Sequence, residues 1–192
     1  MSAATESRAE GQAALAPLAP FAATLRAQRW FAALGRPAEA ADAELARTYL
    51  AGLGLADLAL DWIERWRDAE RVIRAPATAA PWWQVEEDAR QDLLATIRST
   101  ATEPDYLVAM NRVVLAATEA VIGPAEAAAA RAGIADPALI RVAAGAATQA
   151  CHQAALALAA GAPEDHAFTL KFRLYASGRW PLGAVGTRFF LF

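Results

Sequence analysis

Apolar side chains recur at helical spacing along much of this chain, so the sequence predicts a largely helical protein. The clearest period comes from five residues that follow one another at spacings of four, four, three and four: Leu58, Trp62, Trp66, Ala69 and Ile73. Asp57 is a suitable N-cap for this helix. Pro76 ends it, because proline has no amide N–H for the helical hydrogen bond.

Residues that start and stop helices divide the rest of the chain into further helical segments. Proline favours the first helical position, Asp and Thr favour the N-cap, and glycine favours the position just after the last turn. From these signals we expect helices over residues 20–35, 42–53, 81–100, 102–123 and 136–161. Gly123 and Pro124 are expected to break the fourth of these, and a short alanine-rich segment then leads to Arg131.

Residues 163–177 fit two structures. Apolar and polar residues alternate from Phe168 to Tyr175, which is typical of a strand with one buried face. Pro163 and the following acidic residues, in contrast, resemble a first helical turn, and Gly178 stands where a C-cap glycine would. Because the start and stop signals agree, we favour helix over strand.

The last fifteen residues, GRWPLGAVGTRFFLF (178–192), cannot continue a helix because they contain three glycines and a proline. They predict two short extended pieces, RWPLG and TRFFLF, joined by a turn at residues 184–186. The expected fold class is therefore all-α: an irregular bundle of six or seven helices with a short non-helical, hairpin-like C-terminal segment. We expect one domain over 1–192, with a disordered or loosely attached N-terminal segment (1–18) and a C-terminal strap (178–192).

Composition and charge exclude several classes of function. Alanine supplies much of the 56% hydrophobic content, and the nearest candidate for a membrane span, residues 137–160, contains arginine, glutamine and histidine. A net charge of −3 argues against a dedicated nucleic-acid-binding protein. No basic segment leads into an apolar one at the N-terminus, so we expect no signal peptide and a cytoplasmic location.

The C-terminal part of the chain is basic and aromatic. Residues 1–136 carry nineteen acidic and thirteen basic residues (net −6), whereas residues 137–192 carry two and five (net +3). The aromatic side chains of the tail must be covered, and we favour a strap that lies across the bundle and completes its core. The alternative is a docking surface for another protein or a second copy of this one, formed by Arg173, Arg179, Trp180, Arg188, Phe190 and Phe192.

A polar line without acidic residues runs along the helix expected at 136–161. Its candidate ligand-binding residues are Arg141, Thr148, Gln149 and His152. An amide, a hydroxyl and an imidazole are groups that a wet internal pocket uses, so one hypothesis is a small-molecule pocket bordered by this line. The interpretation that we favour is a partly exposed stripe with no binding role, and a haem or metal contact through His152 is a third.

No catalytic or metal site is predicted. Cys151 and His152 are neighbours on a helix and point about 100° apart, so they cannot form a nucleophile–base pair, and Cys151 is expected to be a small core residue. Neither histidine follows a glutamate by three residues, as a di-iron bundle requires. No cofactor is identified. We interpret the cluster of acidic residues in the helix at 81–100 as a solvated face: Glu86, Glu87, Asp88 and Asp92.

These observations lead to two hypotheses for function. The first is a cytoplasmic accessory or interaction protein that holds a partner through a helical groove and the basic, aromatic C-terminal region. The second is a small-molecule-binding helical protein or enzyme with a pocket lined by Arg141, Gln149 and His152. The fold permits both and decides neither.

Overall fold

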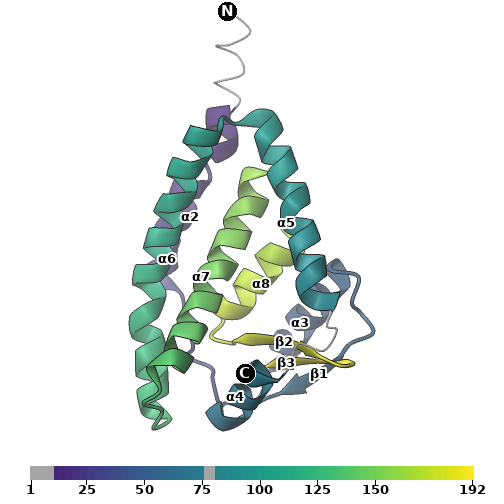
Figure 1. Ribbon diagram of the computed structural model, residues 1–192, viewed down its shortest axis with the longest axis vertical. Coiled ribbons are helices and arrows are strands. Elements are labelled where there is room, and N and C mark those ends of the chain that lie inside the picture. The colour runs from purple at the N-terminus through teal and green to yellow at the C-terminus, as the bar shows by residue number, and fades with distance from the viewer. Residues whose placement is uncertain (1–10, 76–80) are drawn as a thin grey trace, which may run out of the picture.

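The computed structural model describes residues 11–75 and 81–192, and most of the described chain is helical (Figure 1). Helices α5 and α6 meet at one end of the molecule and diverge toward the other, with α7 and α8 between them (Figure 1). The helices of the bundle are α2 (Leu18–Thr24), α5 (Pro81–Thr100), α6 (Glu103–Arg131), α7 (Pro137–Ala159) and α8 (Ala167–Ala176). α7 packs against α6 on one side and α8 on the other, which confirms the predicted bundle.

A small sheet lies at the wide end of the bundle. It contains β1 (Ala59–Trp62), β2 (Pro181–Val185) and β3 (Arg188–Leu191) in the order β1-β3-β2. β3 is antiparallel to β2 and parallel to β1, so the C-terminal hairpin was predicted correctly and its third partner was not. The turn of the hairpin lies at residues 186–187 rather than 184–186, and Gly186 supplies the positive φ (60°) that it needs.

The helix expected over residues 57–75 was predicted wrongly in its first half. Residues 59–62 form β1, and the helix is only α4 (Trp66–Arg74). The Ala59 amide donates to the Thr187 carbonyl at 3.0 Å, and the Ile63 amide donates to the Leu191 carbonyl at 2.7 Å. The tail thus offers this segment strand hydrogen bonds along one edge, which a local helical period cannot reveal.

The break expected at Gly123 and Pro124 does not occur, because α6 runs without interruption from Glu103 to Arg131. Proline removes one helical hydrogen bond and costs about 3 kcal/mol. Val121 and Ala125 on either side are 1% and 0% exposed, and the helix packs along α7 over this region. Burial against a neighbouring helix therefore outweighs the local cost of the proline.

The helix expected over 20–35 is shorter than predicted. α2 ends at Thr24, a 3-10 turn η1 (Leu25–Ala27) follows, and the chain then bends. The Arg29 amide donates to the Ala176 carbonyl at 3.1 Å, and the Ala33 amide donates to the Gly178 carbonyl at 3.2 Å. A Cβ on Gly178 would lie 2.7 Å from the Ala33 nitrogen, so this close approach requires glycine.

Other boundaries follow the local signals. α5 begins at Pro81 and α7 at Pro137, and the helix expected at 42–53 is α3 (Ala40–Gly52). The segment for which we favoured helix over strand is α8. Of the N-terminal segment expected to be loose, residues 1–10 lie outside the described part, residues 11–15 are helical and Leu18 is buried. Residues 76–80 also lie outside it.

Two groups of buried side chains form the core. The larger lies within the bundle and includes Trp66, Trp180 and Phe192. The smaller joins α3 and α8 to the sheet and includes Tyr49, Leu174 and Phe189. Among the described residues, α6 is the one helix long and apolar enough to span a membrane by length and composition, and 39% of that apolar stretch is buried within the protein.

Candidate functional site

The main candidate site is a pocket of about 580 Å³ where the start of α5, the middle of α7, α8 and β2 meet. Its walls are largely aromatic and include Trp82, Trp83, Tyr175 and Trp180. The end of α4 and aliphatic side chains of α7 and β2 complete the apolar surface. Six polar or charged side chains also line the pocket: Glu86, Glu87, Arg90, Gln149, Gln153 and Lys171.

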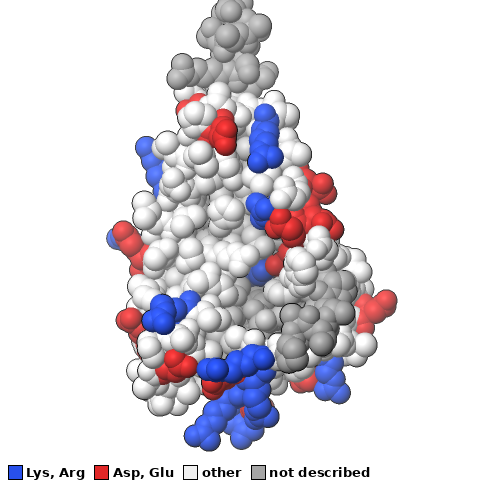
Figure 2. All heavy atoms as spheres, viewed as in Figure 1, with Lys and Arg blue, Asp and Glu red and all other residues white. Residues whose placement is uncertain are grey.

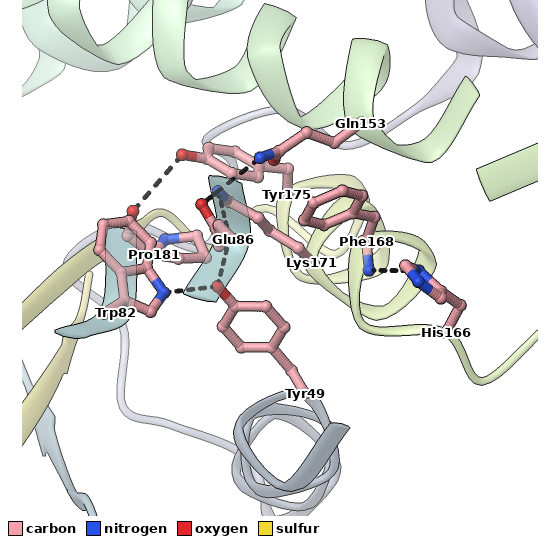
Figure 3. A network of polar contacts seen from close by, with 9 residues as sticks. All are labelled: Tyr49, Trp82, Glu86, Gln153, His166, Phe168, Lys171, Tyr175 and Pro181. Atoms are coloured by element: carbon pink, nitrogen blue, oxygen red, sulfur yellow. Dashed lines mark hydrogen bonds and ion pairs between the residues drawn. The ribbon is translucent and has the colours of Figure 1, made fainter. Parts of the chain in front are cut away.

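A buried ion pair lies on the wall of this pocket (Figure 3). The Lys171 ammonium is 2.7 Å from both carboxylate oxygens of Glu86, and the two side chains are only 6% and 7% exposed. Lys171 comes from α8 and Glu86 from the second turn of α5, so the pair joins segments 85 residues apart. Such a pair is retained in a protein interior only when further hydrogen bonds compensate the lost hydration of both charges.

Two residues of the smaller core supply this compensation from below the carboxylate. The Tyr49 hydroxyl donates to Glu86 Oε1 at 2.7 Å, and the Trp82 indole N–H donates to the Tyr49 hydroxyl oxygen at 2.7 Å (Figure 3). The Lys171 nitrogen also lies 5.0 Å from the centroid of the Trp82 ring, a cation–π distance. Burial and the adjacent Glu86 carboxylate hold the pKa of Tyr49 well above its usual value, so this hydroxyl keeps its proton and acts as a donor.

Gln153 completes the network from α7. Its side-chain amide nitrogen lies 3.4 Å from Glu86 Oε2, and the residue is 2% exposed. A carboxylate repels an amide oxygen, so this contact fixes the orientation of the amide and points the nitrogen toward Glu86. Gln153 Oε1 then has no hydrogen-bond partner among the residues that the structure describes. A buried acceptor without a donor costs about 1–3 kcal/mol, so this atom lowers the stability of the fold.

The charges of the site balance one another. Burial lowers the pKa of Lys171, and the Glu86 carboxylate opposes that shift. At the rim, Arg90 holds Glu87 through two hydrogen bonds of 2.8 and 2.6 Å, and the pKa of Glu87 falls to about 2. The charged side chains on the pocket lining therefore sum to zero, and the pocket presents polar groups to a ligand with no net charge of its own.

The polar line predicted on α7 does not converge on this pocket. Gln149 is on its lining, but Arg141 is exposed and Thr148 and His152 are half-buried away from the lining. Burial, together with the nearby Arg90 charge, lowers the pKa of His152, so the imidazole is neutral at pH 7. The α7 residue that contacts the buried ion pair is Gln153, which belongs to the same polar line but was not among its four candidate ligand-binding residues.

Glu86 and Lys171 were also missed as functional residues. Glu86 stands among acidic residues at the start of α5, and we interpreted all of them as a solvated face; for Glu86 this was wrong, since it is 5% exposed. One signal was present: Lys171 is the only lysine among eighteen basic residues. Lysine and arginine are not interchangeable in a compact buried ion pair, so a single lysine in an arginine-rich chain is a signal for such a pair.

The C-terminal residues predicted to form a docking surface lie in different places. Arg179, Trp180 and Phe192 are 2%, 1% and 1% exposed, so the tail covers the core with them. The Arg179 guanidinium bonds Asp42 at 2.9 Å and the carbonyls of three residues before α3: Ala33, Arg36 and Pro37. Arg173 and Arg188 are exposed, and Phe190 is half-buried.

A second groove, of about 480 Å³, lies between α4 and the turn that follows α6. Trp66, Phe192 and Ile134 are among its apolar lining residues, and four charged residues join them: Glu64, Arg65, Arg67 and Arg131. Arg65 pairs with Asp68 at 2.8 Å, whereas Arg67 and Arg131 have no ion-pair partner within the described ranges. Figure 2 shows basic side chains gathered at this end of the molecule, where α4 lies.

Cys151 and His166 lie in surroundings that give them structural roles. Burial raises the pKa of the Cys151 thiol to about 12, so it is a protonated core side chain at neutral pH. His166 is the N-cap of α8, and its Nδ1 accepts a hydrogen bond from the Phe168 amide at 3.2 Å (Figure 3). Within residues 11–75 and 81–192, His, Cys, Asp and Glu side chains form no group of three that could hold a metal ion.

Comparison with known proteins finds no matching protein-family model, no matching curated protein and no matching solved structure.

Proposed function

We propose that this protein binds a small, largely aromatic molecule in the pocket between α5, α7, α8 and β2. The observation that carries the proposal is the pocket itself: about 580 Å³ in volume, with the half-buried Trp82 and the 56% exposed Trp83 on its lining beside the buried Glu86–Lys171 pair. This is the small-molecule hypothesis of the sequence analysis, with Gln153, Glu86 and Lys171 in place of Arg141 and His152.

The shape and lining of the pocket support this proposal. A volume of about 580 Å³ lies in the range of small-molecule sites, which are mostly apolar with a few well-placed polar groups. Trp82 is half-buried and Trp83 is 56% exposed at the pocket, so these two side chains offer flat surfaces against which a ring can stack. The exposed face of such a ring is a large apolar area that a ligand would cover.

The rigidity of the polar wall also supports it. Glu86 receives hydrogen bonds from three different elements, through Tyr49 of α3, Gln153 of α7 and Lys171 of α8. Side chains held in this way lose little entropy when a ligand arrives, so the site is organised before binding.

The test fills the pocket from α7. Ala146 lines it and is half-buried, so Ala146→Phe places a ring inside the space that the ligand would occupy. Ala138→Phe adds the same ring at an exposed position of the same helix and is the matched control. We expect aromatic fragments in a ligand-observed NMR screen to bind the wild type and the control, and to lose binding in Ala146→Phe. Fragments that bind all three proteins alike, or none of them, would overturn the proposal.

The groove beside α4 favours a second function, which is the holding of a protein partner. Arg67 and Arg131, together with Arg65, border an apolar lining that includes Trp66 and Phe192. This pattern is complementary to an acidic segment that carries an apolar anchor, because the anchor can enter the groove while its carboxylates meet the guanidinium groups. The interaction hypothesis then rests on this groove rather than on the buried Trp180.

A labelled peptide with glutamates around one phenylalanine is the probe for this second function. We expect it to bind the wild type, to bind more weakly as salt concentration rises, and to lose binding in Arg67→Glu/Arg131→Glu. Arg141→Glu, at an exposed position of α7, is the control and should bind as the wild type does. Equal binding of an analogue with lysines in place of the glutamates would contradict this assignment.

A further inference from the structure

The outward side of α6 carries an apolar stripe that the rest of the described chain leaves exposed. Six large hydrophobic side chains are exposed in residues 11–75 and 81–192, and four of them belong to α6: Leu107, Val108, Leu115 and Ile122. Their exposed fractions are 49%, 53%, 65% and 37%. Single exposed apolar residues are common on protein surfaces, whereas four on one side of a helix form a patch that marks a contact surface.

Three of these side chains form a straight seam. Val108, Leu115 and Ile122 follow one another at intervals of seven residues, which is almost two turns of an α-helix. The seam is about 21 Å long, given the rise per residue of an α-helix. Val113 and Ala117, which are buried against the bundle, project from the opposite side of α6. This period is typical of one helix packed against another, so we expect a helix to cover the seam.

Two residues of opposite charge flank the seam on one side. Arg112 and Glu119 are both exposed there, three residues before Leu115 and four residues after it. The other flank carries the uncharged Asn111 and Thr118. The charged flank therefore changes from basic to acidic at the middle of the seam.

This order of charges makes the surface complementary to itself in one orientation. If a second α6 lies antiparallel, with the two Leu115 side chains at the centre, Arg112 of each copy faces Glu119 of the other, and the attraction occurs twice. In a parallel pair, like charges would face each other and repel. Glu119 binds Arg26 of η1 at 2.6 Å through Oε2, so its other oxygen can receive the second guanidinium.

We propose that a second copy of this chain covers the stripe, and that the two α6 helices pack antiparallel about a two-fold axis at Leu115. Val108 of one copy then lies against Ile122 of the other. One helix from each copy makes a small interface, so we expect a dissociation constant of about 1–30 µM. None of the residues that line the pocket between α5, α7, α8 and β2 belongs to α6, so this inference does not rest on the proposed function.

Sedimentation equilibrium of the full chain measures the association. We expect the wild type to approach twice the monomer mass as concentration rises. Leu115→Glu should weaken association at least about 100-fold, because it places a carboxylate of each copy in the apolar seam. Val142→Glu makes a similar change on α7, where Val142 is 45% exposed on the pocket lining, and it should dimerise as the wild type does. Circular dichroism checks that both variants keep the fold.

Two charge variants test the orientation. Arg112→Glu and Glu119→Arg each bring like charges together in the antiparallel pair, so each alone should dimerise about tenfold more weakly than the wild type. An equal mixture of the two variants should recover the wild-type affinity, because each then faces the opposite charge. Both positions are exposed, so both variants are expected to fold even if Leu115→Glu does not.

A wild type that stays monomeric at about 300 µM, tenfold above the weakest expected dissociation constant, would overturn this inference. If that monomer binds phosphatidylglycerol–phosphatidylcholine vesicles and Leu115→Glu does not, the stripe faces a lipid surface instead. Dimerisation that persists in Leu115→Glu would place the interface elsewhere. The antiparallel arrangement would be wrong if neither charge variant weakens association, or if their mixture associates no better than either variant alone.

Discussion

Removing the Lys171 charge should destabilise the fold strongly, because it leaves the Glu86 carboxylate buried without its counter-ion. The two groups are 2.7 Å apart, and the Coulomb attraction across that distance at an effective dielectric constant of about 20 is about 6 kcal/mol. Tyr49 and Gln153 still donate to the carboxylate in Lys171→Met and offset part of this loss. We expect a net loss of about 3–5 kcal/mol in the free energy of unfolding.

The assay is urea unfolding followed by circular dichroism, with two further variants. Glu86→Gln/Lys171→Met removes both charges and keeps an acceptor for Tyr49, so it should recover much of the lost stability. Arg26→Met breaks an ion pair of 2.6 Å whose side chains are 76% and 62% exposed, and it should cost at most about 1 kcal/mol. If Lys171→Met does not fold, recovery of the fold in the double variant still tests the reasoning.

Two results would refute this account of the pair. The first is a loss of unfolding free energy in Lys171→Met no larger than that in Arg26→Met. This would mean that water in the pocket hydrates the Glu86 carboxylate well enough to stabilise it without a counter-ion. The second is a double variant as unstable as Lys171→Met, which would mean that the methylene packing of Lys171 matters more than its charge. Either result would also weaken the case for a rigid polar wall in the pocket.

Three further predictions follow from buried groups. Cys151, with a pKa of about 12, should not react with a thiol reagent at neutral pH until the protein is unfolded, and fast reaction of the native protein would contradict its burial. Burial holds the pKa of Tyr49 and Tyr175 well above 10, so the stability they contribute is present below about pH 10 and lost as pH rises further; spectrophotometric titration should show them ionising only with unfolding. Arg179→Met should lower the free energy of unfolding by about 3–5 kcal/mol in urea, because Asp42 loses its buried partner, and a change below about 1 kcal/mol would contradict this.

Local signals in the sequence were sufficient for most helices. Asp136 and Pro137 start α7 as expected, and the side chain of Asp136 accepts from the Ala138 amide at 2.8 Å. Gly178 follows α8 as expected, whereas the helix begins at Ala167 with His166 as its N-cap and not with the turn predicted at Pro163. Such signals work because N-caps, proline and glycine act on the backbone within a few residues of themselves.

Local sequence signals could not predict the candidate site. Glu86 lies among residues that suit a solvated helix start, and nothing within its own helix shows that Lys171 of α8 covers it. Gln153 lies one turn beyond Gln149 on nearly the same face of α7, and only the packing of other elements decides that Gln153 is buried while Gln149 is exposed. The partner that determines the role of each residue is tens of residues away in the chain.

By itself, the sequence determined the helical class, most helix ends and the extended hairpin of the tail, because hydrogen bonds and caps between near neighbours govern those features. Tertiary structure decided that residues 59–62 pair with the tail as a strand, that α6 continues through Pro124, and that Arg179 and Trp180 are buried. It also brought Glu86, Gln153 and Lys171 onto one pocket wall. These outcomes depend on which surfaces exclude water together, and that is a property of the folded chain rather than of any short segment.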